Sequence, residues 1–326
     1  MNIYDIAKKA GVSPATVSRV INNKPNISDR TYQKVQAVLK ESNYIPNAIA
    51  RGLVSNSMNL IGIIVDDIRN LYRSHIIYEL SQLLNQHRYN TIIFDFGNQD
   101  NDLFNSLQQQ QLDALIFIGS SFSTPYVTDY ISKYYPATPV MMFNGLLDLP
   151  NAYSVICDEA AGMELIVEHL YRTGKKNFVY VNYSENLASQ RKLAGFCKKL
   201  EEYGLAFDES RLITTTGDFE GGRDAAARLL QYSIPCDALV CGLDLIAMGA
   251  MYSLKHFGYS IPGDIAITGF DNIIYGKLSD PFLTSVDSNH KEMARVAIEN
   301  LLGALRKEEA EKVVYVRPFL FCGGTS

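Results

Sequence analysis

The stretch DIAKKAGVSPATVSRVINN, residues 5–23, predicts two short helices joined by a tight turn. Apolar residues at positions 3, 6, 7 and 10 recur at the spacing of one helix face. Gly11 ends this helix, Ser13 can cap a second helix, and Pro14 suits the first helical position because no donor is needed there.

The second helix has an apolar side and a polar side. Val17, Val20 and Ile21 form the apolar side and are expected to pack on the first helix. The side chains left to face outward are Ala15, Thr16, Ser18, Arg19 and Asn22. So small a polar face suits the DNA major groove, where Arg19 could donate to guanine O6 and N7. The alternative is an ordinary helical hairpin with Arg19 in solvent.

Charge placement favours the DNA-binding interpretation. The chain as a whole carries −5, but up to Asn56 it holds eight Lys or Arg against three acids, a net of +5. The remainder holds 22 basic and 32 acidic residues. A small basic head on a large acidic body is typical of a phosphate-binding module joined to another domain.

Two further segments follow before the body of the chain. A third helix is predicted after Ser28, with Tyr32, Val35, Val38 and Leu39 as its buried stripe. Residues 45–59 then predict a short helix and a polar linker, in which Gly52 costs about 1 kcal/mol relative to alanine. So short a helix should order only when something holds it.

From Leu60 the chain alternates apolar runs with helical stretches. The first series of runs is LIGIIV, NTIIFDF, DALIFIG and PVMMF, and the second is KNFVYV, RLITTT, DALVCG and DIAITGF. Helices are expected near 74–87, 102–110, 125–134, 159–172, 188–203, 220–231 and 244–257. Such runs predict buried parallel strands, and two series predict two α/β lobes with a ligand crevice beyond the carboxyl ends of the strands.

The composition excludes several classes of protein. Hydrophobic residues make up 47% of 326 residues, enough for two or three cores. A run of about 18 apolar residues is absent, as is a secretory signal, so we expect a cytoplasmic protein with no membrane partner. Five scattered cysteines indicate reduced thiols, and neither the close pair Cys236 and Cys241 nor the five histidines, at 75, 87, 169, 256 and 290, have metal-ligand spacing.

The chain resembles the lactose-repressor/galactose-repressor (LacI/GalR) family of bacterial transcription regulators over essentially its full length. The motifs that carry the resemblance are DIAKKAGVSPATVSRVINN, YIPNAIARGL, IGIIVDDIRN, GDFEGG, IPGDIAITGFDN and DPFLTSVD, in the family's order. The resemblance implies a repressor of carbohydrate genes that binds a near-palindromic operator as a homodimer. It also implies a periplasmic-binding-protein-like core that holds a small effector, most simply a sugar or sugar derivative, and needs no cofactor.

The resemblance also divides the chain. Residues 1–44 correspond to an all-α helix-turn-helix head, 45–59 to a hinge helix and linker, and 60–326 to the effector-binding and dimerisation core. Within the core, the first lobe would take about 60–158 and 289–318, and the second about 159–288 and 319–326.

For DNA, the resemblance places Leu53 where hinge leucines wedge into the central base step, although Leu53 could instead belong to a permanent helix core. Gly52 departs from the family's small polar residue, which suggests a looser hinge. The whole set expected at DNA is Ser13, Ala15, Thr16, Ser18, Arg19, Asn22, Lys8, Arg51 and Leu53. Of these, Lys8, Asn22 and Arg51 are expected near phosphates.

For the effector, the family's ligand contacts fall on nine residues. They are Asp66, Tyr72, Arg73, Ser120, Asn144, Arg191, Lys192, Phe219 and Asp271. Lys192 stands at the position of the family's ligand-binding arginine, with Arg191 beside it as an alternative. Phe219 matches a stacking aromatic and Asp271 an acid that accepts from ligand hydroxyl groups.

Four positions depart from the family's pattern: Arg73 replaces an aromatic, Asn144 an aspartate, Lys192 an arginine and Leu243 a polar residue. Arg73 and Lys192 in one cleft would favour a phosphate or carboxylate on the ligand.

Each effector assignment has a structural rival. Tyr72 and Phe219 could be core aromatics, Asp271 could cap a helix, and Arg73 could pair with Asp66 or Asp67.

The sequence disfavours two other classes of function. An enzyme is disfavoured because the chain lacks a dinucleotide-binding glycine pattern, a phosphate loop and a G-x-S-x-G elbow, so we expect no catalytic residue. A sugar-transport protein would explain two lobes, but it requires a signal peptide and leaves the basic head unexplained.

Overall fold

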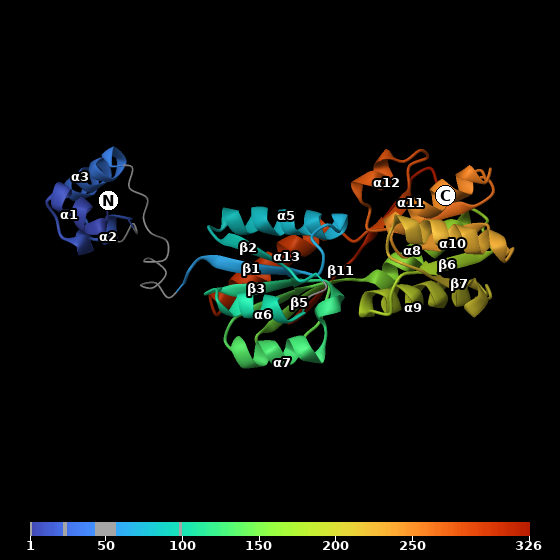
Figure 1. Cartoon of the computed structure of the whole chain (residues 1–326), viewed down its shortest axis with the longest axis horizontal. Coiled ribbons are helices and arrows are strands. Elements are labelled where there is room, and N and C mark those ends of the chain that lie inside the picture. The colour runs from blue at the N-terminus through green and yellow to red at the C-terminus, as the bar shows by residue number, and fades with distance from the viewer. Residues whose placement is uncertain (1, 22–24, 43–56, 98–99) are drawn as a thin grey trace. The chain divides into compact units, whose positions relative to one another are not determined.

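The computed structural model describes residues 2–21, 25–42, 57–97 and 100–326 of the chain (Figure 1). The chain divides into two compact units, Met1–Asn59 and Leu60–Ser326. Each unit is described by itself. No helix in the described ranges combines the length and apolar character that a membrane crossing requires.

In residues 2–21 and 25–42 of the first unit, the structure has three helices, α1 (Ile3–Ala10), α2 (Pro14–Ile21) and α3 (Asp29–Glu41). Gly11 ends α1 in the left-handed conformation, with φ of 59°, and Pro14 opens α2, as predicted. The core consists of Ile6, Ala7, Ala10, Val17, Val20 and Val35. These six side chains come from all three helices, so each helix depends on the other two for its burial.

The prediction that Tyr32 is buried in the core of this unit was wrong. Tyr32 is 37% exposed, whereas Val35, one turn later on α3, is completely buried. Val38 and Leu39 are partly buried against the same core. The periodicity of α3 predicts which side of the helix packs, but α1 and α2 leave the first turn of that side in contact with solvent.

The first sheet of the second unit is built from six parallel strands in the order β11-β5-β4-β3-β1-β2. The strands are β1 (Leu60–Val65), β2 (Asn90–Asp95), β3 (Ala114–Ile118), β4 (Val140–Phe143), β5 (Ala152–Cys157) and β11 (Val313–Val316). Helices α5 (Leu71–Gln86) and α13 (His290–Leu305) share one core cluster, and α6 (Asp100–Gln108) and α7 (Pro125–Tyr134) share another. The two pairs therefore cover opposite faces of this sheet (Figure 1).

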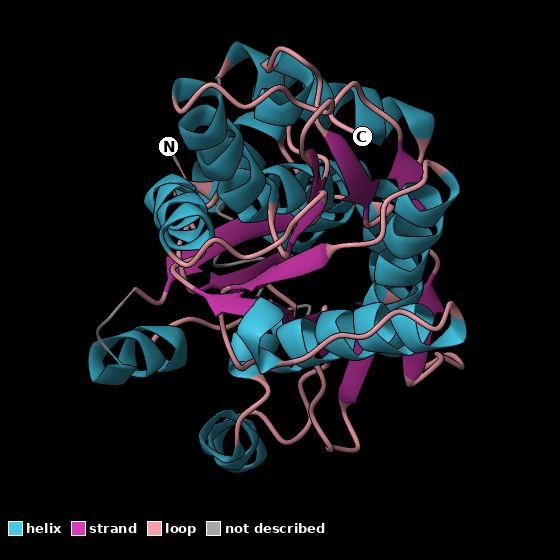
Figure 2. Cartoon of the chain, turned by 90° about the vertical axis from the view of Figure 1, so that its right-hand side faces the viewer, coloured by secondary structure: helices cyan, strands magenta, loops and turns pink. Residues whose placement is uncertain are grey.

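The second sheet repeats this plan in the order β12-β10-β9-β8-β6-β7, with only β12 antiparallel to its neighbour. The strands are β6 (Phe178–Asn182), β7 (Leu212–Thr214), β8 (Ala238–Cys241), β9 (Ala266–Phe270), β10 (Thr284–Asp287) and β12 (Phe319–Phe321). The helices are α8 (Glu159–Arg172), α9 (Leu187–Glu202), α10 (Phe219–Gln231), α11 (Asp244–His256) and the short α12 (Ile274–Leu278). Figure 2 shows the strands of the core enclosed by helices.

The chain passes between the two sheets three times. It crosses after β5 into α8, after β10 into α13, and after β11 into β12. The predicted alternation of runs and helices is confirmed, because all eight of the quoted apolar runs contain a strand. The alternation missed β5, β10, β11 and β12, all four of which lie next to a crossing between the sheets.

Candidate functional site

A cavity of about 290 Å³ lies where the carboxyl ends of strands from both sheets meet. Six of the nine predicted effector residues line it: Tyr72, Arg73, Ser120, Asn144, Lys192 and Asp271. The first four belong to the lobe built on β1–β5, and the last two belong to the other lobe. The volume of this cavity lies at the lower end of the range that is typical of small-molecule sites.

Arg73 lies in the first turn of α5 and pairs with Asp66, which follows β1. The Nη2 atom of Arg73 is 2.7 Å from Oδ2 of Asp66, and each side chain is 25% exposed. Ser121 donates to the same Asp66 oxygen over 2.9 Å. Asp66 itself is not part of the cavity lining, so its role in this geometry is to position the Arg73 guanidinium.

Arg191 does not line the cavity, because a buried acid holds it elsewhere. Its Nε atom is 2.8 Å from Oε2 of Glu159, which is only 1% exposed. Asn144 donates from Nδ2 to Oε1 of the same carboxylate over 2.8 Å and accepts from the Cys157 backbone at 2.9 Å. The family resemblance treats Asn144 and Arg191 as two independent ligand contacts. In the structure both side chains instead bond to the carboxylate of Glu159.

Lys192 lies within the cavity wall and is only 3% exposed. Its ammonium donates to the Gly242 carbonyl over 2.9 Å and lies 3.8 Å from the centre of the Phe270 ring. Burial alone would lower the pKa of Lys192, but Tyr183, Asp271 and Glu159 outweigh burial, and that pKa lies above its ordinary value. Lys192 is therefore a buried cation at neutral pH.

The position of Lys192 depends on a close approach of two helices. A Cβ atom on Gly195, one turn further along α9, would lie 2.3 Å from the Ala160 carbonyl of α8. Only glycine fits such a contact between backbones. The glycine of SQRKLAGF thus sets the distance between α9, which carries Lys192, and α8, which carries Glu159.

Asp271 follows β9 directly and has an unusual backbone conformation, with φ of 110°. Its amide donates to the Val286 carbonyl over 2.8 Å, which fixes the turn against β10. Burial raises the pKa of Asp271 to about 6, in spite of Lys192 and Arg73. The residue that caps α12 is Ile273, so the rival interpretation of Asp271 as a helix cap was wrong.

A second buried acid supports the Asp271 turn from behind. Asp244, at the start of α11, accepts from the Ile273 amide over 2.7 Å and from the Ser285 hydroxyl over 2.5 Å. Burial, with the nearby Asp271, raises the pKa of Asp244 well above its ordinary value. Strain and buried acids at one turn are characteristic of functional sites.

Tyr72 connects the lobes at the cavity. Its hydroxyl is 2.8 Å from the Ser288 hydroxyl, in the segment that crosses from β10 to α13. Tyr72 also packs against the main core, so it has a structural role as well as a place in the lining. Ser120, just after β3, is 9% exposed and also lines the cavity.

Phe219 is absent from the cavity lining. Its ring lies 5.7 Å from that of Tyr252, and Gly217 is the residue of this loop that lines the cavity. The aromatic that sequence reasoning missed is Tyr183, which directly follows β6 and lines the cavity. The rule that residues just after each strand face the crevice would have found it.

In the first unit, α2 presents the predicted outward face. Ala15 and Arg19 are exposed, and Thr16 and Ser18 are partly buried. The Ser13 hydroxyl accepts from the Thr16 amide over 3.1 Å and lies 2.9 Å from the Thr16 hydroxyl, which confirms Ser13 as the cap of α2. Lys8 is exposed in the last turn of α1. Asn22, Arg51 and Leu53 lie outside the described residues.

Comparison with known proteins matches both units. The profile of the bacterial regulatory proteins of the lacI family matches residues 2–47. The profile of periplasmic binding proteins and the sugar-binding domain of the LacI family matches residues 58–322. These two matches cover most of the chain in the order of its two units.

Individual relatives cover almost the whole chain. An HTH-type transcriptional regulator of Lachnoclostridium phytofermentans is 34% identical, over 94% of this chain and 93% of that protein. Catabolite control protein A of Priestia megaterium is 29% identical, over 98% and 96%.

Two solved structures share the fold. A lac repressor dimer bound to operator and the anti-inducer ONPF superposes with a TM-score of 0.88, at 22% identity over 100% of this chain and 98% of that one. A complex of the regulator CelR with cellobiose gives 0.75, at 20% identity and full coverage of both chains. From the profiles and the relatives together, the chain belongs to the LacI family of DNA-binding transcription regulators.

Proposed function

We propose that this chain is an effector-controlled repressor that acts in the cytoplasm as a homodimer on a near-palindromic operator. The observation that carries the proposal is the exposed face of α2, where Arg19 and Ala15 project from a helix fixed by its Ser13 cap and by a three-helix core. A rigid helix with a slim polar face is what major-groove recognition requires. The dimeric lac repressor on operator DNA shares this fold.

Within this proposal, some residues contact the bases of the operator and others contact its phosphates. Ala15, Thr16, Ser18 and Arg19 face bases, and Lys8 lies near phosphates, as do Asn22 and Arg51. Leu53 keeps its predicted place at the central base step. The corresponding segments are a head of residues 1–44, a hinge of 45–59, and a core of 60–326 with the two lobes divided as the family resemblance implies.

We propose a neutral polyhydroxyl compound, such as a sugar, as the effector. Arg73 and Lys192 suggested an anionic ligand from the sequence alone. However, Asp66 neutralises Arg73, and Lys192 faces Asp271 and Glu159. With both cations compensated, the cavity offers hydroxyl, amide and carboxylate groups beside the rings of Tyr72, Tyr183 and Phe270, which suits a sugar ring. CelR, of the same fold, holds cellobiose.

The effector is bound and released without chemical change in this proposal, so the chain is not an enzyme and needs no cofactor. Its relatives are regulators. To control DNA binding, the effector must bind the DNA-competent and DNA-incompetent states with different affinities.

The DNA part is tested by selecting duplexes from a random library with the full chain and then measuring affinities by fluorescence anisotropy. Arg19→Ala should lose about 1–3 kcal/mol on the selected operator and relax the choice at one base pair. Lys8→Ala is the matched control, because loss of a phosphate contact should weaken all duplexes alike and reduce the salt dependence. Undiminished discrimination by Arg19→Ala would refute the base-reading role.

The effector part is tested by titrating sugars and sugar phosphates calorimetrically into the full chain. We expect neutral sugars to bind and to change operator affinity, and the matched sugar phosphates to bind at least about tenfold more weakly because no uncompensated cation meets them. Tighter binding of the phosphates would overturn the neutral assignment while leaving the DNA-binding proposal intact.

A further inference from the structure

Three potential metal ligands from distant parts of the chain meet outside the effector cavity. His75 and Glu79 lie one turn apart on α5, and His290 is the first residue of α13. One ligand atom from each lies within 4.8 Å of the other two. Nε2 of His75 is 3.5 Å from Oε1 of Glu79, and the two imidazole centres are 4.8 Å apart.

His290 is the least satisfied member of this cluster. Both of its ring nitrogens are buried without a hydrogen-bond partner among the residues the structure describes. Its Nδ1 atom lies 3.6 Å from Oδ1 of Asp287, an ion-pair distance that is long for a hydrogen bond. Buried polar atoms normally have partners, so an imidazole in this state points to a missing water or ion.

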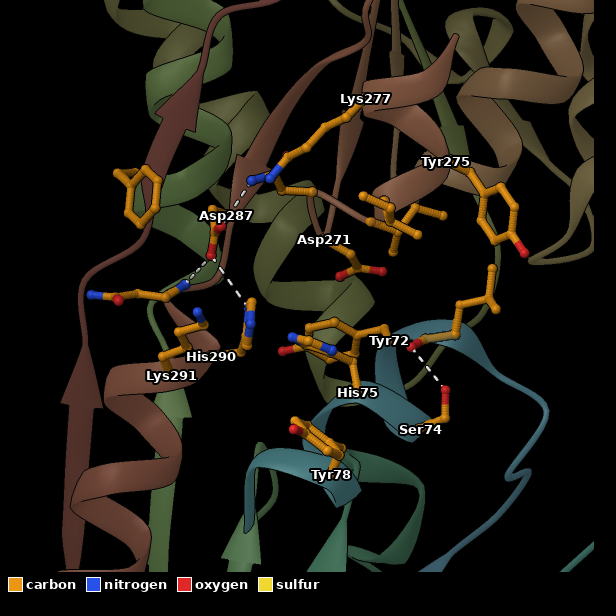
Figure 3. Close-up of a pocket in the computed structure, with 16 residues that line it drawn as sticks. Tyr72, Ser74, His75, Tyr78, Asp271, Tyr275, Lys277, Asp287, His290 and Lys291 are labelled. Carbon is orange, nitrogen blue, oxygen red and sulfur yellow. Dashed lines mark hydrogen bonds and ion pairs between the residues drawn. The ribbon is translucent and has the colours of Figure 1, made fainter. Parts of the chain in front are cut away.

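The cluster opens on a pocket of about 680 Å³, which is separate from the effector cavity although Tyr72 and Asp271 line both. Figure 3 shows His75 and His290 among the side chains that line it, with a dashed line from Asp287 to His290. An ion could therefore reach the two imidazoles from solvent.

We propose that His75, Glu79 and His290 form a binding site for a borderline divalent transition-metal ion, specifically Zn²⁺. Two imidazoles and a carboxylate are zinc ligands, and a fourth, open position would be filled by water. Residues four apart on a helix put their side chains on one face, so His75 and Glu79 can share one ion. Ligand type disfavours Mg²⁺ and Ca²⁺, which prefer oxygen ligands alone.

Asp287 positions the third ligand. A carboxylate that pairs with one imidazole nitrogen orients the ring and leaves the other nitrogen for the metal, a common arrangement around zinc-bound histidines. Here Asp287 faces Nδ1, which assigns Nε2 of His290 to the ion. Asn272 donates to Asp287 Oδ2 over 2.8 Å and the Asn289 amide donates to Oδ1 over 2.8 Å, so the carboxylate is itself held in place.

The distances require only small movements. Ligand atoms about 2.0–2.2 Å from a tetrahedral zinc ion lie roughly 3.3–3.6 Å from one another. The observed spread reaches 4.8 Å, and the 3.5 Å separation of His75 and Glu79 is already suitable. Side-chain rotations that move the ring nitrogens of His290 and His75 by about 1 Å would close the site.

The experiment uses the full chain without a histidine tag, freed of metal by a chelator. Zn²⁺ is titrated in competition with a chromogenic chelator, and Co²⁺ is used as a spectroscopic substitute. We expect one equivalent per chain, with affinity reduced at least about tenfold in each of His75→Gln, Glu79→Gln and His290→Gln. Mg²⁺ and Ca²⁺ should not compete.

Two controls separate this site from other donors. His87→Gln makes the same change at an exposed histidine just beyond the end of α5 and should leave zinc affinity unchanged. Cys322→Ser removes the exposed thiol that lies 4.0 Å from His169 Nδ1, the competing pair of soft ligands, and should also have no effect.

Melting temperatures without metal establish that the variants fold, and Zn²⁺ should raise the melting temperature of the wild type but not of Glu79→Gln. Glu79 is partly exposed, so its replacement keeps the test decisive if a histidine variant is unstable. Absence of zinc binding in the wild type, binding kept in the folded ligand variants, or binding lost in Cys322→Ser would each overturn the proposal.

Discussion

The two lobes share one strand order but place charge differently at the edge where they meet. The first lobe supplies Arg73 and Asp66, a pair in which each side chain is a quarter exposed. The second lobe supplies Lys192, Asp244 and Asp271, of which Lys192 and Asp244 are almost completely buried. Exposed pairs contribute little to stability, whereas buried charges are costly unless compensated. We therefore expect the second lobe's edge to be sensitive to single substitutions and the first lobe's edge to tolerate them.

The largest effect on stability is expected at Lys192. Lys192→Met should lower the free energy of unfolding by about 3 kcal/mol at pH 7, because Asp271 loses the cation that stabilises its charge most and the Gly242 carbonyl loses its donor. Urea denaturation of the core measures the loss. Lys198→Met is the matched control on the same helix: Lys198 is 62% exposed and pairs with Glu164, so its replacement should leave the free energy of unfolding almost unchanged. Equal losses in the two variants would remove the distinction between buried and exposed charge.

Asp271 should give a smaller effect of opposite sign. The pKa of its carboxyl is about 6 in the folded chain, raised by burial above the ordinary 3.8. The folded state thus holds the proton more tightly than the unfolded state, and stability from this group is present below pH 4 and lost as the pH rises through 6.

Asp271→Asn should therefore be more stable than wild type at pH 7.5, by about 1–3 kcal/mol, and equal to it near pH 4. Unfolding measured across this pH range checks the sign. The same variant should bind the effector more weakly, since the acceptor for ligand hydroxyl groups is lost. A variant that is less stable at every pH would contradict burial as the dominant influence on this carboxyl.

The smallest change in stability is expected in the first lobe. Arg73→Ala should lower the free energy of unfolding by less than about 1 kcal/mol, because the pair with Asp66 is partly exposed and Ser121 still donates to Asp66. Its effector affinity should nevertheless fall, because the guanidinium lines the cavity. A double-mutant cycle with Asp66→Asn measures the pair energy, and a value as large as the Lys192 effect would erase the contrast between the lobes.

The head and most of the core could be predicted because their signals are local. The α1 and α2 helices follow from apolar spacing, Gly11, Ser13 and Pro14, which act within a few residues of one another. Continuous apolar runs likewise marked eight strands. No such run marks β10, whose buried residues Thr284, Ser285 and Asp287 are polar and satisfied by distant partners such as Asp244. A strand stabilised in that way has no apolar signature.

The sequence by itself determined the helix-turn-helix head, the alternation of strands and helices, and the rule that ligand-facing residues follow the strands. Tertiary structure decided which of those residues meet. Arg191 pairs with Glu159 and Arg73 pairs with Asp66. Tyr183 lines the cavity, whereas Phe219 does not. It also brought His75 to His290, two histidines without metal-ligand spacing in the chain. The physical reason is range, because spacing along the chain fixes the face of a helix or strand, whereas contacts between side chains depend on how separate elements pack.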